Sequence, residues 1–384
     1  GYLKPQPGVA VTRLLPKLAN RWLSPDELEA LTLGIPGNVV NEMNLALGDL
    51  SELARQSPQL VERFNHLGDD AFAWLADAAH TNRSTPFFDA WDDFLSRYGS
   101  RGPSEIDIMM ARWHENPLPV LRVIAGNIEK NVSSRAQFEA LAQTRETTFE
   151  NLLDVAGRGL LGSFRKRLFK RLYHVLVEAG GMREHHKFMM IRFLWVVKVI
   201  LKENADKLVA MGKLATSDDI WFLTWDDLLN IWDDKETSWH EIVAQRRMDL
   251  THYLKLTPPP VITSDGETPV VQYRVEDAPP GALVGNPVSA GIVEGMVHII
   301  HDPTTEILQA GEILVAPFTD PGWTPLFINA GGLIMDIGGT LAHGSVVARE
   351  YGIPAVVGVR DATTRLKTGQ RVRIDGNRGI IEII

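Results

Sequence analysis

The clearest chemistry in this sequence belongs to a histidine in a glycine-rich segment near its C-terminal end. Residues 338–358 read GGTLAHGSVVAREYGIPAVVG. The pattern predicts a glycine-rich turn, a short helix that begins at His343, a stop at Gly352 and then a buried strand. A neutral imidazole nitrogen is a nucleophile toward phosphorus, and the unpaired N–H groups of a helix N-terminus favour anionic oxygens. We therefore interpret His343 as a phosphoryl acceptor, the alternative being an ordinary capping or surface histidine.

Small and cationic residues around His343 suit a phosphoryl group. Gly338 and Gly339 are expected to let the backbone turn tightly and to leave room for a bulky phosphoryl donor. We assign the binding of the phosphoryl oxygens to four residues of the turn and helix: Gly339, Gly344, Ser345 and Arg349.

A second group of charged residues lies at the start of a long predicted helix. Arg183 and Lys187 are four residues apart and therefore share a helix face. Two cations there could neutralise a phosphoryl group during transfer, and Glu184 could orient or deprotonate an acceptor hydroxyl. The alternative is a solvated helix start with an incidental charge pair.

A third polar cluster occupies a Gly/Pro-rich loop. It contains Arg101, Glu105 and Asp107, followed by Arg112 and Trp113. The loop lines a substrate pocket or docks the histidine domain; the alternative is that a buried ion-pair network fixes it. Under the first interpretation Arg101, Glu105 and Trp113 contact the substrate.

The aromatic residues and methionines of the helical region are expected to be mostly core, with some lining a pocket for a large apolar acceptor. The set is Met189, Met190, Phe193, Trp195, Trp221 and Phe222. No spacing of histidines or acidic residues brings three metal ligands together, so we predict no metal site. The histidines and acidic pairs His185-His186, Asp218-Asp219, Asp226-Asp227 and Asp233-Asp234 are assigned to solvated helix faces.

The elements that position these residues divide the chain in three. Residues 1–256 form a mostly helical domain, since apolar residues recur at spacings of three and four from about Asp26 onward. Residues 257–282 are a Pro-rich hinge. Residues 283–384 consist of short β-branched runs and two short helical pieces, and predict a compact mixed β/α domain. The fold class is thus a multidomain α and α/β protein.

Composition excludes several functions. The 384 residues carry a formal charge of −9, so the chain lacks the overall positive charge of a nucleic-acid binder. It has no cysteine, which rules out disulfides and thiolate chemistry and fits a cytoplasmic location. The most apolar stretch, residues 188–201, is interrupted by two cations and is too short to span a membrane. The chain does not begin with methionine, which indicates a piece of a longer protein.

Residues 283–384 resemble the swivelling phosphohistidine domain of the phosphoenolpyruvate-utilising enzymes and dikinases. That family's signature places a Gly-Gly pair before the histidine and an Ala-Arg-Glu-x-Gly-Ile-Pro-Ala run after it. The resemblance implies a compact β/β/α domain whose histidine, His343 here, carries a phosphoryl group between two distant sites. Leu341 replaces the threonine by which the pyruvate phosphate dikinases are regulated. The matching segments are residues 285–291, 311–315, 319–325, 338–358 and 375–376.

The order of a helical region before the histidine domain is similar to that of the rifampicin phosphotransferase family. Further likenesses lie at residues 37–43, 98–107, 112–113 and 183–187. The resemblance places Arg183 and Lys187 near the phosphohistidine. It implies that ATP and Mg²⁺ bind an ATP-grasp domain, encoded upstream or on another chain, and that a hydroxyl of an acceptor such as an ansamycin is phosphorylated, with release of AMP and phosphate. Antibiotic resistance would follow. The alternatives are a free-standing phosphocarrier or ligand-binding module, or a subunit like phosphoenolpyruvate synthase or phenylphosphate synthase.

Overall fold

The N-terminal part of the chain is helical, as predicted. The computed structural model describes residues 24–67, 74–75, 86–130, 133–182, 184–256, 259, 261–268, 278–303, 306, 308–327, 329–340 and 342–384. The helices in this part are α2 (Pro25–Ala30), α3 (Val39–Arg55), α4 (Pro58–Asn65), α6 (Pro86–Tyr98), α7 (Leu118–Lys130), α8 (Ser134–Ala156), α9 (Gly162–Gly181), α10 (His185–Ala210), η1 (Ser217–Phe222), α11 (Trp225–Asn230) and α12 (Trp239–Tyr253). Arg183, Leu341 and residues 257–258, 260 and 269–277 of the predicted hinge lie outside the described residues.

Capping residues define several helix ends. Ser24 and Glu27 exchange hydrogen bonds at the start of α2 and form a capping box. The Asn38 side chain accepts from the Val40 N–H and begins α3. Gly212 follows α10 with a φ of +72°, a conformation that glycine adopts without steric cost. The predicted single helix from about 186 to 211 is therefore confirmed.

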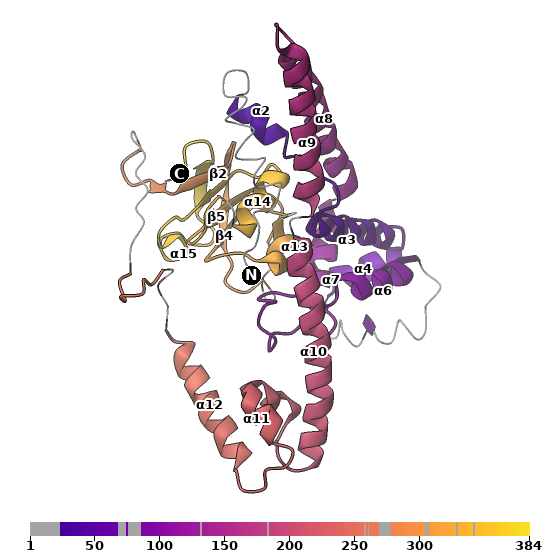
Figure 1. Ribbon diagram of the computed structural model, residues 1–384, viewed down its shortest axis with the longest axis vertical. Coiled ribbons are helices and arrows are strands. Elements are labelled where there is room, and N and C mark those ends of the chain that lie inside the picture. The colour runs from indigo at the N-terminus through magenta and orange to yellow at the C-terminus, as the bar shows by residue number, and fades with distance from the viewer. Residues whose placement is uncertain are drawn as a thin grey trace. The chain divides into compact units, whose positions relative to one another are not determined.

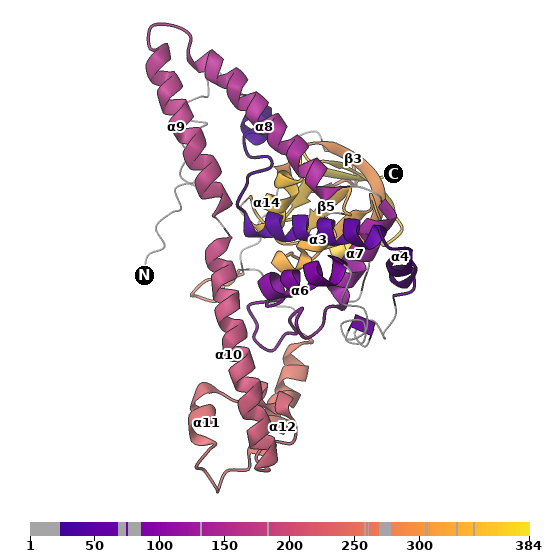
Figure 2. The same ribbon diagram turned by 90° about the vertical axis from the view of Figure 1, so that its right-hand side faces the viewer.

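Helix α3 organises the helical core. It packs against α4, α6, α7 and α8 (Figure 2). Its buried face contributes Val40, Met43, Leu47 and Leu50 to the largest cluster of buried side chains in the described part of the chain. The remaining face of α3 carries asparagines, and Asn38, Asn41 and Asn44 are also buried. Asn38 and Asn44 form hydrogen bonds with side chains of the C-terminal domain.

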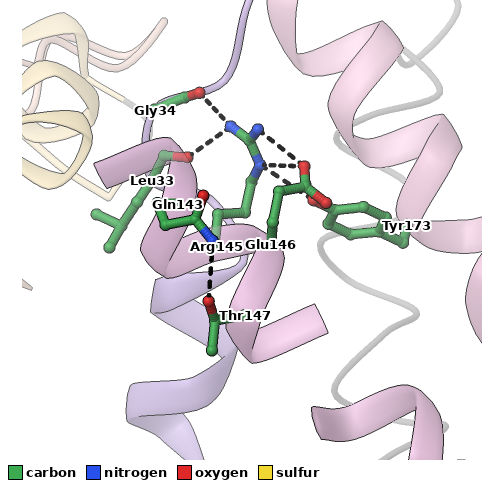
Figure 3. A network of polar contacts seen from close by, with 7 residues as sticks. All are labelled: Leu33, Gly34, Gln143, Arg145, Glu146, Thr147 and Tyr173. Carbon is green, nitrogen blue, oxygen red and sulfur yellow. Dashed lines mark hydrogen bonds and ion pairs between the residues drawn. The ribbon is translucent and has the colours of Figure 1, made fainter. Parts of the chain in front are cut away.

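A buried arginine fixes the loop that leads into α3 (Figure 3). Arg145 on α8 donates to the carbonyl groups of Leu33 and Gly34. Its guanidinium also lies 3.0 Å from Glu146 Oε1 and 3.0 Å from the Tyr173 hydroxyl, which joins α8 to α9. Burial and the hydrogen bond to Glu146 raise the pKa of Tyr173 to about 12, so this hydroxyl stays a donor.

The C-terminal domain is a mixed sheet with helices (Figure 1), as the sequence predicts. Its strands follow the order β1-β8-β7-β3-β4-β5-β6-β2. Strands β3 to β6 are parallel, and the pairs on either side of them are antiparallel. The elements are β1 (Leu283–Val284), β2 (Asn286–Ser289), β3 (Ile292–Ile299), β4 (Ile313–Ala316), η2 (Pro321–Trp323), α13 (Thr324–Phe327), β5 (Gly332–Met335), α14 (His343–Glu350), β6 (Ala355–Val357), α15 (Ala362–Arg365), β7 (Arg371–Asp375) and β8 (Ile380–Ile383).

The chain forms two compact units, and their division does not follow the boundary between helices and strands. The first unit contains residues 1–104, 112–188 and 273–384, so the sheet domain and the α3 bundle belong together. The second contains residues 105–111 and 189–272. No helix among the described residues has the length and apolar character needed to cross a bilayer.

Candidate active site

His343 lies where the parallel strands end. The segments that follow β4 and β5 both leave the carboxyl edge of the sheet, the edge at which open α/β sheets bind ligands. His343 is the first residue of α14, as the sequence predicts. The preceding residue, Ala342, supplies no capping oxygen. The N–H groups of the first helical turn are therefore oriented to bind an anion beside the imidazole.

Polar groups lie on two sides of the imidazole ring, but among the described residues only Nε2 has a contact of hydrogen-bond length. His343 Nε2 lies 3.0 Å from Thr324 Oγ1, and the Thr324 hydroxyl in turn lies 2.8 Å from the Pro321 carbonyl. On the other side, His343 Nδ1 lies 3.9 Å from Glu184 Oε1. The two side chains are only 12% and 13% exposed. His343 and Glu184 are thus nearly enclosed, and the imidazole lies beside polar groups rather than among hydrocarbon side chains alone.

The electrostatic surroundings keep the imidazole neutral. Burial lowers the pKa of His343, and the positive charges of Arg101 and Lys187 lower it further, while Glu184 partly opposes them. The net shift is downward from the ordinary histidine value. A neutral imidazole retains a lone pair, which is the form that a nucleophile needs.

The predicted phosphate-binding residues surround the start of α14. A Cβ on Gly344 would lie 2.3 Å from Thr319 Oγ1, so only glycine allows this close packing. The Ser345 hydroxyl donates to the Gly339 carbonyl at 2.8 Å, and Arg349 donates to the carbonyl groups of Ser345 and Thr340. A Cβ at Gly339 would meet no atom within 4 Å, in agreement with the expected room.

The glycine pair lies between β5 and α14, where the Gly339 carbonyl accepts from the Ala342 N–H in a turn. Gly338 and Gly339 are not among the described glycines with positive φ. At Gly338 the constraint is steric, because a Cβ would come within 3.1 Å of Val357. Gly352, by contrast, has a φ of +65° and ends α14 as predicted.

Charged residues from the helical region gather at the same histidine. Glu184 directly precedes α10, and Lys187 lies in its first turn. Arg101 is buried, with its guanidinium 5.6 Å from the Phe188 ring centre. Sequence segments near 101, 184–187 and 343 thus converge on one imidazole. Arg183 lies outside the described residues.

The other two residues assigned to substrate binding have different surroundings. Trp113 is 1% exposed and stacks on Phe94 within the helical core. Glu105 is fully buried and belongs to the second compact unit. The structure therefore gathers Arg101 at His343 and places Trp113 among packed aromatic rings.

Loop 98–104 contacts the histidine domain directly. The Ser104 N–H donates to Asp320 Oδ2 at 2.6 Å. A Cβ on Gly322 would lie 2.4 Å from the backbone nitrogen of Pro103, so glycine is required for this approach. Of the alternatives open for the loop, these contacts favour docking.

Two further contacts between the helical region and the histidine domain were not predicted. Asn38 Nδ2 donates to Glu350 Oε1 at 3.1 Å, and Asn44 Nδ2 donates to the Tyr351 hydroxyl at 2.6 Å. The recurrence of asparagine at every third position of a predicted helix was the available signal, because it puts polar amides on one face. Thr324 was also missed, although its segment belongs to the matched motif.

The second unit exposes apolar side chains. Met189, Met190 and Phe193 are 59%, 43% and 66% exposed, so their assignment to the core is wrong. Trp221 and Phe222 are partly buried against a small cluster around Leu208.

Two of the acidic pairs also differ from expectation. Asp219 and Asp227 cap η1 and α11 and pair with Arg247 and Arg246, whereas solvated faces were expected. Within the described residues no group of three histidines or acids is arranged to hold a metal ion.

Family comparisons agree with this geometry. Residues 5–184 match the rifampicin phosphotransferase fourth domain, and residues 308–379 match the mobile domain of phosphoenolpyruvate-utilising enzymes. The chain is 38% identical to a rifampicin phosphotransferase of Bacillus subtilis, over 95% of this chain and 42% of that protein. It is 39% identical to one of Streptomyces sviceus, over 98% of this chain and 43% of that protein. A prodigiosin-synthesising transferase of Serratia marcescens is 27% identical over 89% of this chain and 38% of its own length.

Residues 308–379 therefore form the kind of mobile domain that phosphoenolpyruvate-utilising enzymes carry. The chain as a whole is a rifampicin phosphotransferase-like protein that combines the fourth domain of that family with this mobile domain. It spans less than half the length of these curated relatives.

Proposed function

We propose that His343 accepts a phosphoryl group that originates from ATP and passes it to a hydroxyl of a small-molecule acceptor. The observation that carries this proposal is the convergence of Glu184, Lys187 and Arg101 from the helical region on an imidazole at a helix N-terminus. Phosphoryl transfer depends mainly on positioning and charge neutralisation, and this arrangement offers both.

The transfer to the acceptor follows from the roles of these side chains. The phosphoryl group is attached to an imidazole nitrogen of His343, and the acceptor hydroxyl oxygen attacks phosphorus. The N–P bond breaks as the O–P bond forms, the nitrogen recovers its lone pair, and the hydroxyl proton passes to the Glu184 carboxylate. Lys187 and Arg101 stabilise the negative charge on the phosphoryl oxygens. Arg183 belongs to this set by sequence, and Gly339, Gly344, Ser345 and Arg349 hold the oxygens at the helix start.

ATP and Mg²⁺ bind an ATP-grasp domain outside this chain in our proposal, and charging of His343 releases AMP and phosphate. The family uses ATP, and the chain spans only 42% of the Bacillus subtilis relative. A cytoplasmic location, where ATP is available, is part of this proposal. The Pro-rich segment 257–282 is the hinge about which the histidine domain moves.

The acceptor is a large, partly apolar molecule such as rifampicin. Support comes from the names of the relatives and from an exposed apolar stripe on α10. Met189, Phe193, Val196 and Ile200 share one helix face and are 51–66% exposed. The likeness to a prodigiosin-synthesising transferase indicates that acceptors differ within the wider group.

The test supplies an ATP-grasp domain, ATP labelled at its β-phosphate and rifampicin. We expect an acid-labile, base-stable label on His343 that is chased onto rifampicin. His343→Ala should lose the label and keep rifampicin binding. A wild-type chain that is labelled but transfers to no acceptor would support the alternative, a phosphocarrier. An unlabelled wild-type chain would contradict the proposal.

A further inference from the structure

A cavity lies between the helical region and the histidine domain, at the opposite end of α14 from His343. Its volume is about 370 Å³. One wall comes from α3 and α8 and the other from the α13 and α14 region. Glu350 and Tyr351 line it, and they follow His343 by seven and eight residues, which is about 10 Å along a helix. The cavity is therefore separate from the phosphoryl-transfer site.

The floor of this cavity contains unsatisfied amide groups. Asn41 is 2% exposed, and neither its Nδ2 nor its Oδ1 has a hydrogen-bond partner among the described residues. Asn44 Nδ2 donates to the Tyr351 hydroxyl, but Asn44 Oδ1 is buried and has no hydrogen-bond partner among the described residues. Buried amide groups without hydrogen bonds are unfavourable, so a ligand that forms hydrogen bonds with them gains binding free energy.

The walls and the mouth of the cavity determine the size, polarity and charge of the ligand it can bind. Phe138, Leu141 and Phe327 give the cavity apolar sides. Gln137 and Ala140 on α8 line it and are exposed, so the cavity opens to solvent. No lysine, arginine or histidine lines it, and its one carboxylate, Glu350, already accepts from Asn38. An anionic ligand would therefore find no counter-charge.

We propose that this cavity binds a small uncharged molecule that carries an amide or lactam group on an apolar ring. Once the buried asparagine side chains turn toward the cavity, the amide N–H of the ligand donates to Asn41 or Asn44 Oδ1, and its carbonyl accepts from Asn41 Nδ2. The ring packs against Phe138 and Phe327. The size suits a ligand far smaller than an ansamycin.

Such a ligand also stabilises the docking of the histidine domain on the helical region, because the two walls of the cavity come from these two parts of the chain. Anything that binds only the docked form shifts the equilibrium toward it. If His343 shuttles as in the proposed function, on which this consequence rests, the ligand slows the return of His343 to the nucleotide domain. Binding itself does not depend on that function.

The test uses benzamide as the probe on the 384-residue chain, with saturation-transfer NMR and a titration. We expect a dissociation constant on the order of 1 mM, as suits so small a ligand. Benzoate, which is charged, and ethylbenzene, which lacks the amide, should bind at least about tenfold more weakly. Ala140→Phe, an exposed substitution at the mouth, and Asn41→Leu should each weaken benzamide binding about tenfold or more.

Asn127→Leu is the matched control. Asn127 on α7 is 4% exposed, and its amide also has no hydrogen-bond partner among the described residues, but it does not line the cavity. This variant should bind benzamide like the wild type. Equal binding by Asn41→Leu, Ala140→Phe and wild type, or no binding by any of them, would overturn the proposal. His343→Ala should bind benzamide normally, so a failure here is distinct from a failure of phosphoryl transfer.

Discussion

Gly322→Ala tests the docking of the histidine domain on the helical region. The added Cβ would lie 2.4 Å from Pro103 N, 2.5 Å from Pro103 Cα and 2.6 Å from the Gly102 carbonyl carbon. These are backbone atoms, so relief requires the loop and domain to separate by about 1 Å toward ordinary contact distances. Overpacking of this kind costs about 1–3 kcal/mol. The docked fraction relative to the undocked one should fall about 5- to 150-fold.

Hydrogen exchange at Ser104 measures this directly, since its amide donates to Asp320 across the contact. Exchange should accelerate by that factor in Gly322→Ala, and transfer to the acceptor should slow while labelling of His343 persists. Gly157→Ala is the control, because its Cβ would meet Asp154 O at an ordinary 3.4 Å. Unchanged exchange and transfer in Gly322→Ala would refute the assignment of this contact to docking.

Further substitutions probe the interface, the histidine and the scaffold. Asn38→Asp keeps an α3 cap but sets a carboxylate against buried Glu350, so Ser104 exchange should rise at least about tenfold, and Glu350→Gln should restore it in the double variant. Lys187→Met removes a charge that lowers the pKa of His343, so the titration of the unphosphorylated His343 ring, followed by NMR, should move to higher pH, and Glu184→Gln should move it to lower pH. Because the folded pKa lies below the ordinary 6.5, wild-type stability should decline as pH falls through that value, and His343→Ala should lose this decline; an identical decline in the variant would contradict the shift. Arg145→Met should lower the unfolding free energy in urea by about 2–4 kcal/mol, because it leaves buried carbonyl groups without donors, whereas Arg135→Met at an exposed ion pair should cost less than about 1 kcal/mol; equal losses would contradict the role of the Arg145 network.

The sequence predicted the elements with strong local signals. The β-branched runs of the C-terminal domain became strands, and His343 begins a helix that Gly352 ends. These features depend on neighbours within a few residues, so pattern and turn chemistry suffice to find them. The charged turn at 184–187 was also identified, although its approach to His343 rested on resemblance.

Features that depend on distant packing were missed or misjudged. The exposure of Met189 and Phe193 reflects which face of α10 is covered, and composition does not reveal that. The contacts from Asn38 to Glu350 and from Ser104 to Asp320 join residues more than 200 positions apart. The spacing of asparagines could mark one side of such a contact, but one sequence does not reveal the distant partner, so only the folded structure displays the pair.

The central claim is that His343 carries phosphorus to an acceptor. The most direct measurement is mass-spectrometric mapping of the phosphorylated residue after charging by an ATP-grasp domain, before and after addition of rifampicin. The account predicts phosphate on His343 that disappears as a phosphorylated hydroxyl appears on the acceptor. Phosphate on another residue, or acceptor phosphorylation by the His343→Ala variant at the wild-type rate, would contradict it.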